Sequence, residues 1–231
     1  MKTIILFIVG LLLISASCKK KKKCSRSYDL EHPVSVYPIK ESYNVGDTIW
    51  FEMSFSDVFN AEITNNFTGK IFYENIQLKN FDFHRTIFHF SKLVDSTLNI
   101  SGQEEEPLDE FTLIPLEGII QYLHPDAIEY NYSFDSGIYK FKIAVICNQL
   151  GRYVVRPGYG LHYHITSFGA NEQDLTPECE QEIITDIRFP INKQTDGTHL
   201  TNYHLFEQFM NPALENDLGR IKNECFTFVV N

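Results

Sequence analysis

The feature that most constrains this fold is an alternation of apolar and mixed side chains in two segments. In Thr48–Phe55 every second residue is apolar, which gives the set Ile49, Phe51, Met53 and Phe55. In Ile138–Cys147 the same period gives Tyr139, Phe141, Ile143 and Val145. A period of two is typical of β-strands with one buried face. Strands with one mixed face belong to antiparallel sheets, because parallel sheets covered on both sides need continuous apolar runs. The pattern therefore predicts a mainly β, antiparallel fold.

Other segments between residues 33 and 157 have strand-like patterns. They are Lys70–Phe83, Thr86–Val94, Phe111–Ile114, Glu129–Phe134 and Arg152–Val155. No alternation of strands with helices is visible, so a sandwich of two sheets is the expected architecture.

Two short motifs refine this expectation. Tyr43–Ile49 contains a Gly-Asp turn directly before a strand, and Asp135–Phe141 places Tyr139 just after a Ser-Gly turn. These motifs resemble the turn before the second strand and the tyrosine corner of immunoglobulin-like domains. The resemblance implies an immunoglobulin-like sandwich over residues 33–157. The two motifs lie about ninety residues apart, which implies an insertion or another sandwich topology.

After Pro157 the pattern changes, and residues 158–231 are expected to form a smaller C-terminal extension of mixed helix and strand. Helix-compatible spacing occurs in Pro177–Asp186, Leu200–Met210 and Leu214–Lys222, whereas Phe226–Val230 is typical of a final strand.

The N-terminus has the organisation of a secretion signal. Lys2 precedes an apolar run of eleven residues, Ile4–Ile14, which as a helix would rise only about 16 Å, roughly half the thickness of a hydrocarbon core. Small residues follow at positions 15–17, directly before Cys18. We therefore expect residues 1–17 to be a signal peptide. An ordinary secretion signal with a coincidental cysteine, or a short membrane anchor, is the alternative.

Ser15-Ala16-Ser17-Cys18 resembles the lipobox of bacterial lipoproteins, in the relaxed form of Bacteroidetes-type bacteria, with Ser15 where Leu is commonest. The resemblance implies that Cys18 is lipidated and becomes the mature N-terminus. Several acyl chains at about 0.8 kcal/mol per buried CH₂ would make this anchor effectively permanent.

Five lysines, Lys19–Lys23, follow Cys18, and residues 18–32 are expected to be a basic tether. From Ser27 onward 13 Lys and Arg stand against 30 Asp and Glu, a net charge of −17. An acidic body argues against nucleic acid as a partner.

Surface export of Bacteroidetes-like lipoproteins goes with acidic residues behind the lipidated cysteine. The basic run therefore favours a periplasm-facing place on the outer membrane, with the cell surface as the alternative.

Four further cysteines are candidates for disulfides. Their spacing matches no zinc or C-x-x-C pattern, and disulfides are the usual state outside the cytoplasm. We expect Cys179 to pair with Cys225, closing the C-terminal segment, and Cys24 to pair with Cys147 by elimination. Free buried thiols are the alternative.

Catalytic and metal-binding signatures are weak. No Gly-x-Ser-x-Gly motif is present, and His162-Tyr163-His164 offers two imidazoles without an identifiable third ligand. We therefore expect no enzyme activity, no metal and no cofactor.

A candidate ligand platform consists of the aromatic residues Trp50, Tyr159, Tyr163 and Phe168. Its alternative is that these aromatics fill the core.

The sequence thus predicts a non-catalytic binding or interaction module, tethered to the membrane, whose partner is an envelope protein or a glycan. One alternative is a hydrolase acting on glycan or peptidoglycan, which requires convergent carboxylates in a cleft. The other is a structural subunit of a surface assembly that exchanges strands. A fully paired strand within residues 32–38 would count against that second alternative.

Overall fold

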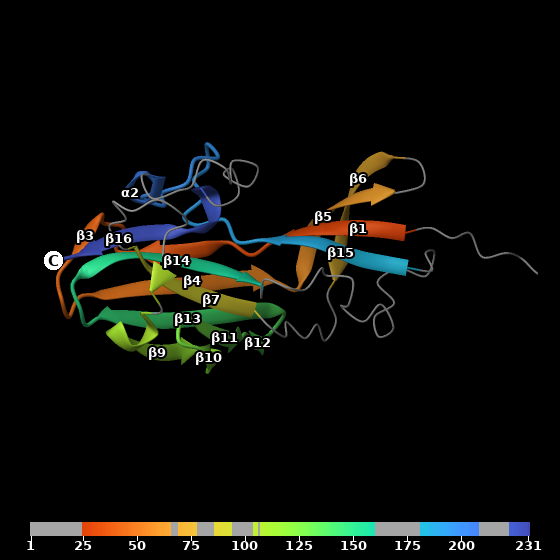
Figure 1. The fold of residues 1–231 in the computed structure, drawn as a ribbon. Helices are drawn as coiled ribbons and strands as arrows, with labels where there is room; N and C mark the ends of the chain where they lie inside the picture. The colour runs from red at the N-terminus through yellow and green to blue at the C-terminus, as the bar shows by residue number, and fades with distance from the viewer. Residues whose placement is uncertain are drawn as a thin grey trace, which may run out of the picture.

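The described part of the chain is mainly β-structure, arranged as a two-sheet sandwich with a third, smaller sheet at one end (Figure 1). The computed structural model describes residues 25–65, 69–77, 86–93, 104–105, 107–159, 181–207 and 222–231. Within these ranges, no helix combines the length and hydropathy that a membrane span requires.

The strands fall into three sheets. The five-stranded sheet contains β12 (Ser133–Asp135), β13 (Ile138–Cys147), β4 (Thr48–Ser56) and β2 (Val34–Tyr37) in that order, with β9 (Phe111–Glu117) also paired to β13. The seven-stranded sheet has the order β10 (Ile119–His124), β11 (Ala127–Asn131), β7 (Thr86–Leu93), β14 (Gly151–Tyr159), β16 (Phe226–Val230) and β3 (Ser42–Tyr43), with β8 (Glu104–Glu105) on β7. The four-stranded sheet has the order β15 (Gln181–Arg188), β1 (Ser25–Glu31), β5 (Val58–Asn65) and β6 (Lys70–Gln77).

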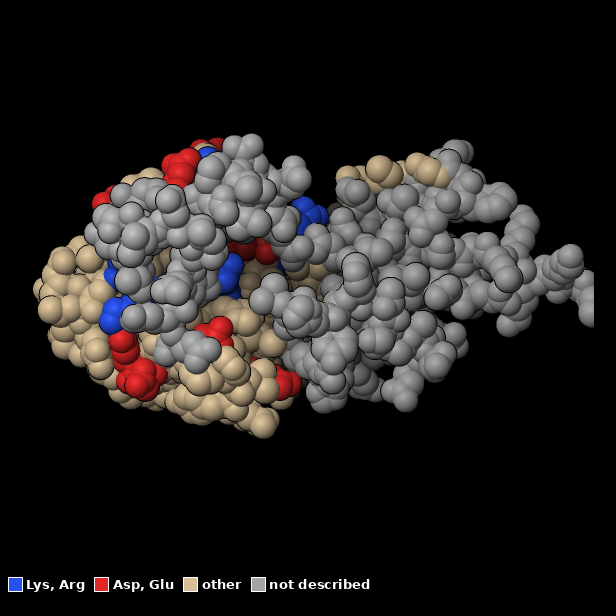
Figure 2. All heavy atoms as spheres, viewed as in Figure 1, with Lys and Arg blue, Asp and Glu red and all other residues tan. Residues whose placement is uncertain are grey.

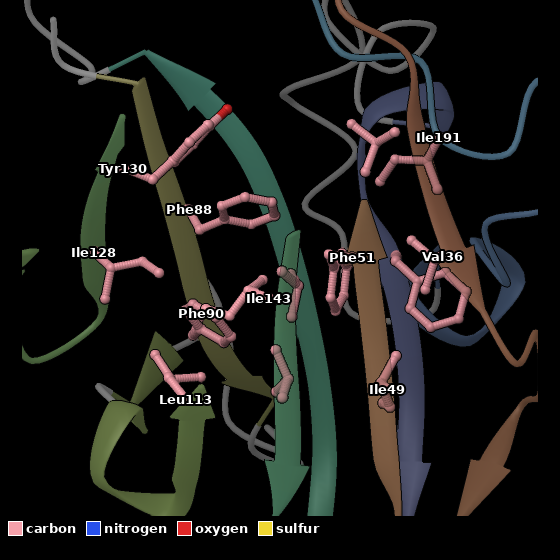
Figure 3. Close-up of a cluster of buried hydrophobic side chains, with 14 of the residues drawn as sticks. Val36, Ile49, Phe51, Phe88, Phe90, Leu113, Ile128, Tyr130, Ile143 and Ile191 are labelled. Atoms are coloured by element: carbon pink, nitrogen blue, oxygen red, sulfur yellow. The ribbon is translucent and has the colours of Figure 1, made fainter. Parts of the chain in front are cut away.

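The core lies between the five- and seven-stranded sheets. The alternation in β4 and β13 is confirmed, since Ile49, Phe51 and Met53 are fully buried. In Figure 3 side chains of both sheets, including Phe51 and Phe88, converge on one cluster, and the rings of these two lie 5.6 Å apart. Burying a side chain of this size contributes roughly 1.5–3 kcal/mol. The predicted mainly β, antiparallel sandwich is therefore confirmed.

The Gly-Asp turn before β4 and the Ser-Gly turn before β13 are both formed. Gly46 has φ +90°, and the Asp47 carboxylate accepts the Asn44 N–H at 2.9 Å, which closes the turn before β4. Tyr139 begins the buried face of β13 and is 4% exposed. Directly before it, the Gly137 carbonyl accepts the Asp57 N–H at 2.8 Å.

The four-stranded sheet is not apparent from the sequence, because it joins the consecutive strands β5 and β6 to β1 and β15, which are far apart in the chain. β1 occupies residues 25–31, which we had placed in the tether, and it pairs in parallel with β15. β15 overlaps Pro177–Asp186, so the predicted helix there is wrong from Gln181 onward. The reason is that pairing with β1, a non-local contact, takes precedence over local helix spacing.

The last strand of the C-terminal extension returns to the sandwich, as the sequence predicts. The boundary at residue 157 falls inside β14, and β16 lies within the seven-stranded sheet, between β14 and β3. The predicted strand Phe226–Val230 is confirmed. Of the helix expected over Leu200–Met210, the described part is a single turn, α2 (His204–Glu207). Almost all of Leu214–Lys222 lies outside the described residues.

Candidate functional site

The candidate site is on the outer face of the five-stranded sheet. Residues that alternate with the buried set point away from the core. Tyr37 of β2 is the register partner of Trp50 of β4, which in turn faces Ala144 of β13. Ala144 is paired on its other side with Ile114 of β9. These four residues form an apolar row across four strands, which we call the outer-face row; Ala144 within it is buried, Tyr37 and Trp50 are partly exposed, and Ile114 is exposed.

A polar pair lies on the same face of the sheet, two residues along the strands from Trp50 and Ala144. Lys142 of β13 is the register partner of Glu52 of β4, and its Nζ lies 3.1 Å from Glu52 Oε2. The Tyr37 hydroxyl donates to the same oxygen at 3.0 Å. Glu52 therefore joins the two flanking strands through their side chains.

The aromatic rings and the ammonium group are stacked together. The rings of Tyr37 and Trp50 have centroids 6.3 Å apart and planes inclined by 18°. Lys142 Nζ lies 5.4 Å from the Tyr37 centroid and 5.7 Å from that of Trp50, within cation–π range. Hydrogen bonding to Tyr37 and to Glu52 raises the pKa of Lys142, so this lysine stays charged at neutral pH.

This arrangement suits binding. Half-buried aromatic rings on a flat sheet face can stack on a sugar ring or a planar group, while a neighbouring ammonium and carboxylate supply hydrogen bonds. Among the described residues, no group of three or more His, Cys, Asp or Glu has an arrangement that could hold a metal ion.

Of the predicted aromatic platform, only Trp50 belongs to this site. Tyr159 ends β14 in the seven-stranded sheet, so it is not in the sheet of Trp50. Tyr163, Phe168 and His162-Tyr163-His164 lie outside the described residues. Tyr37 is the partner that the sequence prediction missed. Its signal was the alternation of Val34 and Val36 with Ser35 and Tyr37, too short to fix a register.

The disulfide prediction needs correction. Cys147 and Cys225 are both free thiols and fully buried, so neither Cys24–Cys147 nor Cys179–Cys225 is formed in the structure. Cys147 ends β13 facing the core, and Cys225 packs in a second cluster with Val154. Burial raises the pKa of each thiol to about 12, which makes both unreactive. Cys24 and Cys179 lie outside the described residues.

Two other groups of buried and partly buried polar residues have structural roles. Lys92 and Glu110 form an ion pair at 2.7 Å, and Tyr153 donates to the same carboxylate, which joins the 3-10 helix η1 (Leu108–Glu110) to β7 and β14. His32 lies between β1 and β2, stacked on Phe55 with ring centroids 4.1 Å apart. Its Nδ1 lies 3.1 Å from the Tyr132 hydroxyl, and burial lowers its pKa to about 3.

Residues 1–24, including Cys18 and the lysine run, lie outside the described residues. Comparison of the chain with protein-family models, curated proteins and solved structures gives no match. The function must therefore be inferred from the chain's own residues.

Proposed function

We propose that this chain is an envelope lipoprotein whose sandwich is a non-catalytic binding module held out from the membrane. Residues 1–17 direct export, Cys18 carries the lipid, and the folded body occupies the periplasmic side of the outer membrane. Support comes from the small residues before Cys18, the basic run behind it and the acidic body.

The observation that carries the proposal is the position of the first described strand. Ser25 pairs with Gln181, and Arg26 with Asn65, at the end of the four-stranded sheet far from the sandwich (Figure 1). At the other end of β1, His32 donates its N–H to the Arg188 carbonyl at 2.8 Å, where the chain enters the sandwich. An anchor before Ser25 would therefore place the four-stranded sheet nearest the membrane and leave the outer-face row accessible.

The ligand that best fits the outer-face row is a glycan or an extended peptide of the envelope. Both offer faces that stack on Trp50 and Tyr37, and both offer hydroxyl or amide groups for Glu52 and Lys142.

Strand exchange receives less support. β2 is paired with β4 on one side. On its other side the Val34 N–H donates to the Pro190 carbonyl at 2.9 Å, the Asn192 N–H donates to the Val34 carbonyl at 2.8 Å, and the Val36 N–H donates to Asn192 Oδ1 at 2.8 Å. Occupied hydrogen-bonding groups on both sides disfavour the assembly-subunit alternative at this strand.

The test is cross-linking in cells followed by mass spectrometry of the captured neighbours, with Trp50→Ala compared with Tyr122→Ala. Tyr122 is 61% exposed on β10, in the other sheet, so it is a matched aromatic control. We expect a specific neighbour that is lost with Trp50→Ala and kept with Tyr122→Ala. Equal capture by both variants would contradict a binding role for the outer-face row.

A further inference from the structure

The four-stranded sheet exposes two large apolar side chains on one face of its edge strand. Ile71 and Tyr73 of β6 are 59% and 66% exposed, and both lie on the same face because they are two residues apart. Figure 2 shows uncharged atoms on the surface where β6 lies. Neither side chain contributes to the core of the sandwich.

The strand register places this pair beside the point where the chain enters the fold. Arg26 is paired with Asn65, and Asn65 is paired with Lys70. Ile71 is therefore one residue from the end of the sheet at which β1 begins. The exposed pair lies at the entry end of the molecule.

The length of chain before Ser25 limits how far this end can be from a lipid at Cys18. Seven residues from Cys18 to Ser25 span at most about 25 Å even when fully extended. Lys19–Lys23 add attraction to anionic headgroups, about 1 kcal/mol for each lysine near the surface. This attraction opposes the repulsion that the acidic body would experience, and it favours close approach of the entry end.

We propose that Ile71 and Tyr73 form a membrane-contact site, which seats the four-stranded sheet on the bilayer that carries the anchor. The inference rests on the proposed lipidation of Cys18. Ile71 would enter the boundary between headgroups and acyl chains, and the amphipathic ring of Tyr73 would lie at the headgroup level. The partner is thus a lipid surface, and the consequence is a fixed orientation of the sandwich in place of free rotation on a tether.

Fluorescence quenching of the full-length lipidated protein in vesicles tests this contact. The vesicles contain phosphatidylcholine and phosphatidylglycerol, with or without bromine on the acyl chains. Tyr73→Trp and Ile71→Trp are the probes, and Tyr122→Trp is the matched control in the sandwich, each in a Trp50→Phe background. Because interfacial groups lie about 5–10 Å into the headgroup and acyl boundary, we expect quenching by about half at positions 73 and 71. Tyr122→Trp should show no change.

The outcomes separate the two proposals. Vesicle-bound protein with unquenched probes at positions 71 and 73 would overturn the contact site and leave the lipid anchor intact. Equal quenching at position 122 would overturn the fixed orientation. Failure of the protein to float with the vesicles would overturn the anchor, and with it the contact site. If the probe emission changes with protein density but is not quenched by bromine, positions 71 and 73 contact other copies of the protein. That result would overturn the lipid proposal.

Discussion

The sandwich and the four-stranded sheet are built from the same kind of strand but stabilised differently. In the sandwich, facing sheets bury Phe51, Phe88 and Phe141 completely. The described side chains of β6 in the four-stranded sheet are exposed. The described core therefore lies mainly in the sandwich, whereas the edge strand β6 of the four-stranded sheet presents its described side chains to solvent and has a surface available for contact.

The largest effect is expected from truncating the core of the sandwich. Phe141→Ala should lower the free energy of unfolding by about 3–5 kcal/mol, because a fully buried ring leaves a cavity. Ile71→Ala on β6 should change it by less than about 0.5 kcal/mol. Urea unfolding followed by circular dichroism measures both. Similar losses for the two variants would contradict the division between the regions.

The free energy of unfolding is expected to depend on pH through His32, which lies where the chain passes from the four-stranded sheet to the sandwich. Burial lowers the folded-state pKa of His32 to about 3 from the ordinary value of 6.5, so below pH 6.5 the unfolded chain takes up a proton at this residue and the folded chain does not. Stability should therefore be full above pH 6.5 and fall between pH 6.5 and 3, by up to about 1.4 kcal/mol per pH unit. His32→Phe should reduce this slope. The same substitution at exposed His204 is the control, and an unchanged slope for His32→Phe would refute the assignment.

A smaller effect is expected on the outer face of the sandwich. Glu52→Gln removes the partner of Lys142, and exposed ion pairs contribute about 0–1 kcal/mol. Ser54→Ala, on the same face of β4, is the control for urea unfolding. A loss above about 2 kcal/mol would mean that the polar group supports the sheet rather than presenting a surface.

The smallest expected effect is that of a reducing agent on the alkylation of Cys147 and Cys225. Cys147 and Cys225 should be alkylated by iodoacetamide after unfolding to the same extent with and without dithiothreitol, because both are free. Peptide mass spectrometry identifies the labelled residues. A requirement for reductant at either cysteine would restore the disulfide prediction.

The sequence predicted the sandwich well where local pattern decides the structure. In β4 and β13 the alternation of side chains is itself the division between core and surface, so Ile49 and Ile143 could be assigned without knowing their partners. β15 was read as helix because its strand state depends on β1, more than 150 residues away in sequence. The outer-face row was only partly predicted for the same reason. Trp50 was visible as an exposed-face aromatic, but its pairing with Tyr37 depends on a register that the sequence does not encode locally.

The most direct test of the central claim is the intact mass of the mature protein purified from membranes. A chain that begins at Cys18, with a mass increase for a diacylglyceryl group and an amide-linked acyl chain, is predicted, and Cys18→Ser should abolish this species. A mature chain that begins elsewhere, or that begins at Cys18 without lipid, would contradict the account.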